Sequence, residues 1–284
     1  MIVLLASFPR SGNTYFRILL HHLYAVPTYT GLYSGDDLET DVDAGYLTGH
    51  QSLPAEARIA SRSGNVARAR VILDRMEASD EVYFINTHNT WTELQRPAYR
   101  TVLLVRDGRD ALVSLAWYSA TLASTFLRLR GVARQEFRWE LKCLFRYARY
   151  ALATSRSTVL RWLGLERMLF RRALRSALED TRWSTFNQDW LEKNDGKFVL
   201  VRFEELIEAP RDTLANALEK LNVPGLSSTA RSIPAFDALK NIHPRFFRQG
   251  KSGEWRREFP AEWLDSFWTR HGDAMLRLGY AKDA

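Results

Sequence analysis

The segment Ser7–Tyr15, which reads SFPRSGNTY, carries residue types that bind anions. It follows a short apolar run and precedes a segment with helical periodicity, so a turn there would direct backbone N–H groups and the positive end of a helix toward one point. Gly12 lets the backbone approach an anion closely, and Arg10 adds a planar cation. Ser11 and Thr14 add hydroxyl donors. The segment therefore predicts a cradle for a phosphate or sulfate group.

The same segment lacks the pattern of a nucleoside-triphosphatase P-loop. That motif needs Gly where Ala6 stands and Lys where Asn13 stands. A Mg-dependent ATPase or kinase is therefore disfavoured, and a nucleotide-dependent kinase of P-loop-like fold is kept only as the alternative.

Two later segments carry comparable chemistry. Residues 106–114 read RDGRDALVS and follow an apolar run, where an Arg at a strand end can pair two phosphate oxygens. Within this segment, Arg109 and Asp110 are interpreted either as a local ion pair or helix cap, or as part of the binding motif. Residues 246–255 read FFRQGKSGEW and place two basic residues around a glycine.

His88 is the histidine best placed for proton transfer. It follows the apolar run Val82–Asn86 directly, in the sequence Asn86-Thr87-His88. An imidazole with an ordinary pKa of about 6.5 is suited to accept a hydroxyl proton near neutral pH. A lone histidine is more often structural, so its assignment depends on the segments around it.

Together these segments resemble the sulfotransferase family, whose members transfer a sulfuryl group from 3'-phosphoadenosine 5'-phosphosulfate (PAPS). The resemblance runs from residue 7 to residue 255, in the family's order. It implies that Ser7–Tyr15 is the 5'-phosphosulfate loop and that His88 is the general base. Arg10 stands where the cytosolic phenol and steroid enzymes carry Lys and where carbohydrate enzymes often carry Arg, which weakly favours a sugar-like acceptor.

The resemblance also implies a set of contacts to PAPS. Arg106 and Ser114 would hold the 3'-phosphate, Phe236 would stack on adenine, and Arg10 would stabilise the leaving phosphate. The whole set comprises Arg10, Ser11, Gly12, Asn13, Thr14, Tyr15, Arg106, Ser114, Phe236, Arg248, Gln249 and Gly250. Gln249 and Asn86 stand where the family usually has Lys, so two positive charges are missing or supplied elsewhere. No metal is required, and a non-catalytic module that binds PAP (3',5'-phosphoadenosine) is a further alternative.

The elements that must position these residues are strands followed by helices. Short apolar runs at Ile2–Ser7, Thr101–Val105, Phe198–Val201 and, more weakly, Val82–Asn86 predict buried parallel strands. Helical patterns follow at Asn13–Leu23, Ala111–Leu122 and Pro210–Leu221. Repeated units of this kind predict an α/β fold, a single sulfotransferase domain over 1–284 with a central parallel sheet flanked by helices.

The positive charge of the chain is concentrated in one segment. The net charge is +7 over 284 residues, whereas residues 121–186 alone carry thirteen Arg and one Lys against five acids. We expect a helical basic insert around 121–182. One of its faces carries Arg134, Arg138, Lys142, Arg146 and Arg149. This face is either the solvated side of a core helix or a surface for an anionic lipid or acceptor. The acidic stretch 31–50 predicts a surface loop, with acceptor binding as the alternative.

The single cysteine and the apolar start of the chain indicate where the protein is located. The single cysteine, Cys143, has no partner for an internal disulfide, and the apolar start of the chain is too short for a signal peptide or a membrane span. We therefore expect a cytoplasmic enzyme, with peripheral contact to the membrane through residues 128–182 as the alternative. Its acceptor would be a small molecule, carbohydrate or lipid, with no nucleic-acid partner, and its oligomeric state is open.

Overall fold

The computed structural model describes residues 1–30, 47–55, 66–94, 96–128, 165–193, 195–229, 231–242, 247 and 250–282. The chain divides into two compact units. The first consists of Met1–Asp107, Arg182–Ser252 and Ala274–Ala284, and the second of Gly108–Thr181 and Gly253–Asp273.

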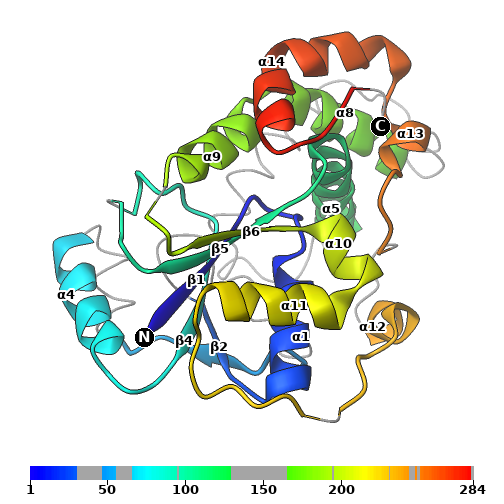
Figure 1. Cartoon of the computed structure of the whole chain (residues 1–284). Helices are drawn as coiled ribbons and strands as arrows, with labels where there is room; N and C mark the ends of the chain where they lie inside the picture. Colours follow the sequence, from blue (N-terminus) through cyan, green and yellow to red (C-terminus); the bar gives the residue numbers. More distant parts are fainter. Residues whose placement is uncertain are drawn as a thin grey trace. The chain divides into compact units, whose positions relative to one another are not determined.

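The first unit is built on a six-stranded parallel sheet (Figure 1). Its strands are β1 (Ile2–Ser7), β2 (Thr28–Thr30), β3 (His50–Ser52), β4 (Tyr83–Thr87), β5 (Arg100–Val105) and β6 (Phe198–Arg202). Their order is β3-β2-β4-β1-β5-β6, and every neighbouring pair is parallel. The predicted central parallel sheet is confirmed, and the four predicted strands match β1, β4, β5 and β6 to within a residue or two.

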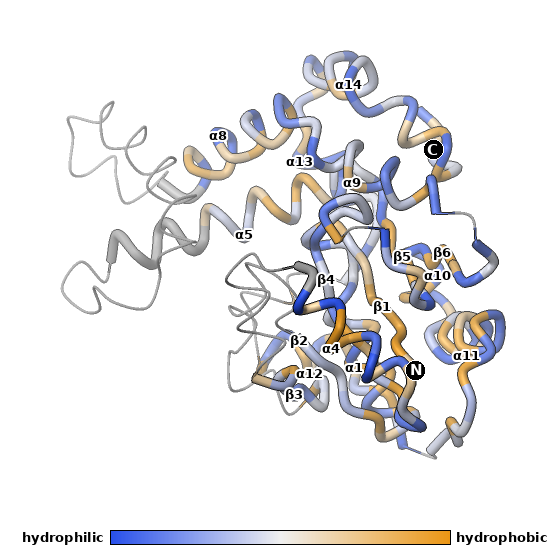
Figure 2. The backbone as a smooth tube through the Cα atoms, turned by 90° about the vertical axis from the view of Figure 1, so that its left-hand side faces the viewer, coloured by the Kyte–Doolittle hydropathy of each residue, from blue (hydrophilic) through white to orange (hydrophobic). Residues whose placement is uncertain are grey.

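The position of β1 explains its composition. It lies between β4 and β5, and all six of its residues are buried. A strand that is covered on both faces has no solvated side, so it reads as a continuous apolar run, as Figure 2 shows.

One face of the sheet is covered by α1 (Asn13–Tyr24) and α11 (Pro210–Lys220), which lie side by side in Figure 1. The shared core includes Phe16, Leu20, Leu214 and Leu218 from the helices and Leu5, Phe84, Val102, Leu104 and Val201 from the strands. α11 begins at a proline, and Asn222 beyond its end has a left-handed backbone, φ 49°. The predicted helix Pro210–Leu221 is thus confirmed to within one residue, and the left-handed Asn222 follows its end.

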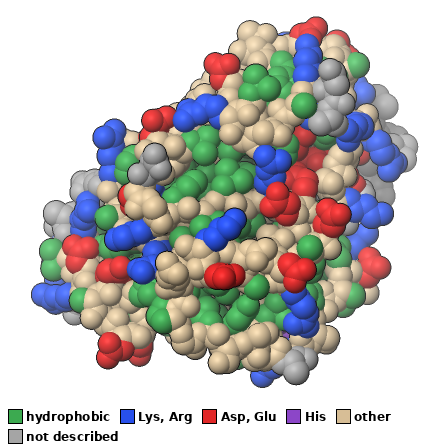
Figure 3. All heavy atoms as spheres, viewed as in Figure 1, with side chains coloured by type: hydrophobic (Ala, Val, Ile, Leu, Met, Phe, Trp, Pro, Cys, Tyr) green, Lys and Arg blue, Asp and Glu red, His purple; other side chains and the backbone are tan. Residues whose placement is uncertain are grey.

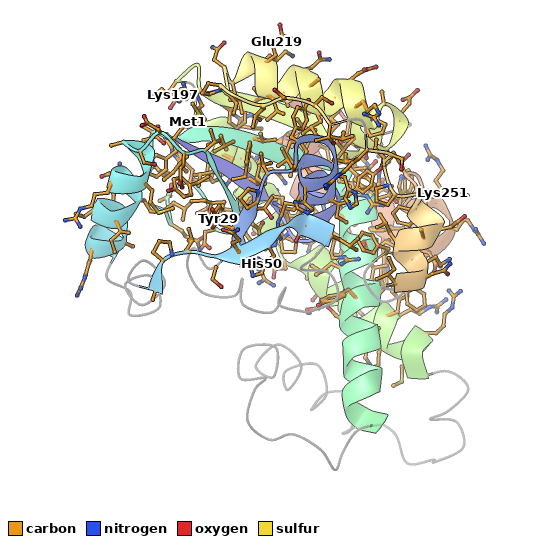
Figure 4. The ribbon with its side chains drawn as sticks, turned by 90° about the horizontal axis from the view of Figure 1, so that it is seen from below. Met1, Tyr29, His50, Lys197, Glu219 and Lys251 are labelled. Atoms are coloured by element: carbon orange, nitrogen blue, oxygen red, sulfur yellow. The ribbon has the colours of Figure 1, made fainter. Side chains whose placement is uncertain are left out.

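The other helices of the first unit are α4 (Val66–Glu77), α9 (Arg182–Leu191), α10 (Phe203–Glu208) and α12 (Phe236–Ile242). Figure 4 shows the polarity of the sheet: Met1 and Lys197, which precede β1 and β6, lie near one edge, and Lys251 lies toward the other. The carboxyl ends of all strands meet at that second edge, where ligands of open parallel sheets bind.

The second unit is helical. It contains α5 (Gly108–Arg128), α8 (Leu165–Glu179), α13 (Trp255–Glu258), a 3₁₀ helix at Ala261–Trp263 and most of α14 (Leu264–Arg277). α5 packs against α8, and the rings of Trp117 and Phe170 stack with centroids 4.3 Å apart. The sequence predicted a helix over Ala111–Leu122, but α5 already begins at Gly108, so the turn before the helix is shorter than expected.

The predicted helical insert is confirmed where it is described, by the end of α5 and by α8. Residues 129–164, which contain Cys143 and the five-residue basic face, lie outside the described residues, as do residues 31–46 of the acidic stretch. On α8, two exposed arginines form ion pairs, Arg167 with Glu258 at 3.0 Å and Arg175 with Glu179 at 3.3 Å. Two of the arginines of that helix are therefore paired with carboxylates.

Charged side chains of both signs are spread over the face shown in Figure 3. Within the described residues, no helix is long and apolar enough to cross a membrane. The same part of the chain contains no group of three or more His, Cys, Asp or Glu that could hold a metal ion.

Candidate active site

Sheet register brings the predicted site residues of the first unit to one edge. Ala6 pairs with Thr87, so Ser7 at the end of β1 lies beside His88, which follows β4. Val105 pairs with Arg202, so Arg106, the next residue after β5, lies beside Phe203, the next residue after β6. Side chains alternate between faces, and these positions continue the face that α1 covers. Strand pairing therefore brings together motifs that lie far apart in the sequence.

The loop between β1 and α1 turns sharply around Ser11. Arg10 and Gly12 both have left-handed backbones, with φ 71° and 101°, and the Ser11 N–H donates to the Phe8 carbonyl at 3.2 Å. A Cβ atom on Gly12 would lie 2.6 Å from the Phe203 ring, so both the conformation and the packing require glycine there. The predicted turn is present in the fold, whereas the predicted close approach of Gly12 to an anion stays a prediction.

Two polar side chains of this loop have different roles. The Asn13 amide donates to the Leu5 carbonyl at 2.8 Å and to Ser7 Oγ at 3.2 Å, so it holds the loop against β1. The Ser11 hydroxyl is buried and has no hydrogen-bond partner within the described part of the chain. A buried hydroxyl of this kind is costly unless a ligand pairs with it, so the loop fits an anionic group.

His88 is held by the end of β1. Its Nδ1 lies 2.7 Å from the Ser7 carbonyl oxygen, which can only accept a hydrogen bond. Nδ1 therefore carries the proton, and the basic lone pair of the neutral ring is on Nε2. This is the tautomer that a general base acting through Nε2 needs. The hydrogen bond from Nδ1 to the Ser7 carbonyl also fixes the orientation of the ring.

Arg106 is buried among the other motifs, 8% exposed. Its guanidinium donates to the Lys251 carbonyl at 2.9 Å and, over a longer 3.5 Å, to the Arg10 carbonyl, and it lies 4.5 Å above the Phe203 ring. One cation thus touches the phosphosulfate-type loop, the C-terminal stretch and the start of α10. Its contacts with backbone carbonyls show that Arg106 holds the two loops, whereas the predicted phosphate contact of Arg106 stays a prediction.

Phe236 and Gly250 meet beside this cluster. Gly250 has φ 62°, and a Cβ atom there would lie 2.4 Å from the Phe236 ring. Phe236 also contacts Phe247 edge-on, with centroids 5.8 Å apart. Tyr15 packs on the same group of apolar residues, and burial raises the pKa of its hydroxyl. Arg248 and Gln249, which the sequence assigned to phosphate contacts, lie outside the described residues.

The remaining predicted residues are Thr14 and Ser114. Thr14 is buried in the first turn of α1. Ser114 is buried in α5 and belongs to the second unit, whereas Arg106 belongs to the first. The joint role of Arg106 and Ser114 at one phosphate therefore stays a prediction.

Phe203 and Glu204 are the residues that sequence reasoning undervalued. Phe203 lies under both Gly12 and Arg106, and Glu204 accepts hydrogen bonds from the Asp107 N–H at 3.1 Å and from the Tyr280 hydroxyl at 2.8 Å. Their only signal was a partial match of the FEEL segment to the family's YEDL. Phe203 and Glu204 follow β6, and the pairing of β6 with β5 brings them beside Arg106 and Asp107.

Comparison with known proteins bears on this site. A family model, described as the sulfotransferase domain, matches residues 2–275. The solved structure of mouse sulfotransferase SULT7A1 complexed with PAP aligns with 98% of this chain and 87% of that chain, at 15% identity and a TM-score of 0.55. Retinol dehydratase in a complex with retinol and PAP aligns over 96% and 81%, at 17% identity and a TM-score of 0.46. The first of these likenesses shows a shared fold. No curated protein matches the sequence significantly.

Proposed function

Because this chain belongs to the sulfotransferase family, we propose that it transfers a sulfuryl group from PAPS to a hydroxyl or amine of its acceptor, with His88 as the general base. The observation that carries the proposal is the meeting of His88, the Ser7–Gly12 loop and Arg106 at the carboxyl edge of one sheet. The acceptor class would be a small molecule, a carbohydrate or a lipid-linked molecule.

The proposed reaction is an in-line displacement. PAPS supplies an activated sulfuryl group: a bond forms from the acceptor oxygen or nitrogen to sulfur, and the bond from sulfur to the 5'-phosphate oxygen breaks. By analogy with phosphoryl transfer the transition state is loose, so positioning and charge stabilisation supply most of the rate. Arg10 and the loop N–H groups would stabilise charge on the leaving phosphate.

His88 would take the acceptor proton on Nε2. The imidazolium that results is stabilised by its Nδ1–H bond to the Ser7 carbonyl, 2.7 Å long. Ser7 ends the strand that leads into the loop, so the base and the loop are positioned by the same backbone. Arg106, Phe236 and Gly250, together with Arg248 and Gln249, would bind the adenosine and its phosphates.

The proposal is tested with PAPS that carries labelled sulfur, an extract of the source organism and the purified protein. We expect a labelled acceptor product with the wild type and none with heat-inactivated protein. A wild type that binds PAP but labels no product in any extract would favour the non-catalytic PAP-binding module instead.

A further inference from the structure

Asp110 lies in the first turn of α5 and accepts two backbone hydrogen bonds from a segment far along the chain. Its Oδ2 accepts the Gly253 N–H at 2.6 Å, and its Oδ1 accepts the Trp255 N–H at 2.8 Å. Both carboxylate oxygens are therefore used, and the residue is only 1% exposed. Hydrogen bonds from amides to a buried carboxylate are short and strong, so they fix the segment that donates them.

Arg109 reinforces the same attachment. Its guanidinium carbon lies 3.8 Å from the ring centroid of Trp255 and 5.6 Å from that of Trp268, and the residue is fully buried. A planar cation against an indole face is held both by cation–π attraction and by packing. Asp110 thus holds the backbone at Gly253 and Trp255, and Arg109 holds the Trp255 side chain.

The segment that Asp110 holds continues directly from Gly250–Ser252. The chain leaves the first unit at two points, after Asp107 and after Ser252. Inside the first unit, Arg106 donates to the Lys251 carbonyl, and inside the second, Asp110 accepts from Gly253. Each unit therefore contains at least one hydrogen bond that joins the RDGRD motif to the C-terminal stretch. Gly253 has φ 80°, a left-handed turn that suits glycine, between these two anchors.

We propose that Asp110 is a positioning residue for Gly250–Ser252, the described part of the proposed phosphate-binding stretch, and that Arg109 supports it. This inference rests on the proposed function, in which Arg106 and this stretch bind the 3'-phosphate of PAPS. The carboxylate fixes where the stretch ends without touching the nucleotide. Its loss should therefore weaken binding of a nucleotide that has a 3'-phosphate far more than binding of one that lacks it.

The test compares two nucleotides that differ only in the 3'-phosphate, PAP and adenosine 5'-phosphate. Binding of each is measured by calorimetry, with the weaker ligand measured by displacement. The variant is Asp110→Asn, whose single carbonyl oxygen cannot accept both N–H groups. The matched control is Asp265→Asn, the same change at an exposed site in the first turn of α14.

For Asp110→Asn we expect PAP affinity to fall about 10- to 100-fold and adenosine 5'-phosphate affinity to change less than about threefold. Asp265→Asn should leave both unchanged. An equal loss for the two nucleotides, or unchanged PAP affinity in a folded variant, would overturn the positioning role alone. Failure of the wild type to bind PAP would overturn the proposed function and this inference together.

A second variant covers the case in which Asp110→Asn does not fold. Arg109→Lys keeps the charge but loses the planar contact with Trp255. It should lower PAP affinity about 3- to 10-fold with little change for adenosine 5'-phosphate. Hydrogen exchange of the Gly253 and Trp255 amides should be slow in the wild type and faster in this variant. Unchanged affinity and unchanged exchange would contradict the proposal.

Discussion

At the scale of single residues, the proposed role of His88 as general base can be tested separately from nucleotide binding. His88→Ala should lower turnover about 10²- to 10⁴-fold, because no other group would take the acceptor proton at that position. PAP affinity should stay nearly intact, since the proposed nucleotide contacts come from other residues. Steady-state rates and calorimetry measure the two effects, with His22→Ala near the end of α1 as the control. Full turnover of His88→Ala would place the base elsewhere, with the acidic residues of 36–43 as the next candidates.

Arg106 should behave in the opposite way. Arg106→Ala is expected to weaken PAP binding by about 1.5–3 kcal/mol, the value typical of a charge-assisted hydrogen bond. Part of that loss should come from the loops, because the guanidinium also holds the Lys251 carbonyl. Arg106→Lys keeps the charge and should recover only part of the affinity. An alanine variant that folds and binds PAP as the wild type does would remove Arg106 from the site.

Gly12 offers a test of packing at the loop. Gly12→Ala combines a left-handed backbone, φ 101°, with a Cβ atom 2.6 Å from the Phe203 ring. We expect a loss of unfolding free energy of more than about 1 kcal/mol, measured by urea denaturation. In a Phe203→Ala background the steric part of that loss should disappear, while the backbone part should remain. A Gly12→Ala variant as stable as the wild type would show that the loop has another conformation.

At the scale of elements, α9 holds the segment that follows His88. Asp189 accepts from the Thr92 N–H at 2.7 Å and from the Thr92 hydroxyl at 2.6 Å, and the Trp190 indole donates to the Asn89 carbonyl at 3.0 Å. Thr90 and Glu93 complete the segment as a capping pair, each accepting the other's N–H. The segment that follows His88, the proposed base, is therefore held by a helix that the sequence did not single out.

Asp189→Asn should loosen this attachment. We expect turnover to fall about 3- to 10-fold with unchanged PAP affinity, because a neutral amide replaces the carboxylate that accepts both hydrogen bonds from Thr92, and the proposed nucleotide contacts lie elsewhere. The control is Asp212→Asn in the first turn of α11. Equal turnover for the two variants would show that α9 does not influence the base.

The elements that the sequence predicted are those whose residues carry a local signal. β1 and β5 are apolar because they are covered on both faces, and α11 has a proline at its start. β2 and β3 have three residues each, TYT and HQS, which is too short for periodicity, so the sheet was expected to be narrower. The role of α9 depends on hydrogen bonds to residues about 100 positions away, which no local pattern reports.

At the scale of the whole molecule, the sequence predicted which motifs would form the site but not which residues hold those motifs, and the roles of the site residues stay predictions. Recognisable sequence motifs contain Ser7, His88 and Arg106. The parallel pairing of β1 with β4 and with β5 brings these motifs together. Phe203, Glu204 and Asp110 gave little signal because their partners come from distant parts of the chain.

Acid stability of the folded chain should depend on His271 of the second unit. The residue is fully buried, and its pKa is lowered to about 4. Burial is the main cause and the positive charge of Arg270 adds to it, whereas Leu178 and Asp180 act in the opposite direction. An unfolded imidazole titrates near pH 6.5, so between about pH 6.5 and 4 the unfolded chain binds more protons. The free energy of unfolding should therefore fall as the pH is lowered through this window, by about 2 kcal/mol at pH 5 from this group.

Denaturant titrations at pH 7 and pH 5 measure this contribution. His271→Gln should remove it, so that the stability difference between the two pH values shrinks, whereas His50→Gln at the partly exposed strand β3 should leave it unchanged. The same pH dependence in wild type and His271→Gln would assign the acid sensitivity to other groups.

The most direct measurement of the central claim is calorimetric titration of the wild-type chain with PAP and, separately, with ATP in the presence and absence of Mg²⁺. A site that binds the two phosphates of a 3',5'-phosphoadenosine should bind PAP at least about tenfold more tightly than ATP, with no dependence on Mg²⁺. Tighter binding of Mg-ATP than of PAP, or no binding of PAP, would contradict the assignment of this edge of the sheet to PAPS.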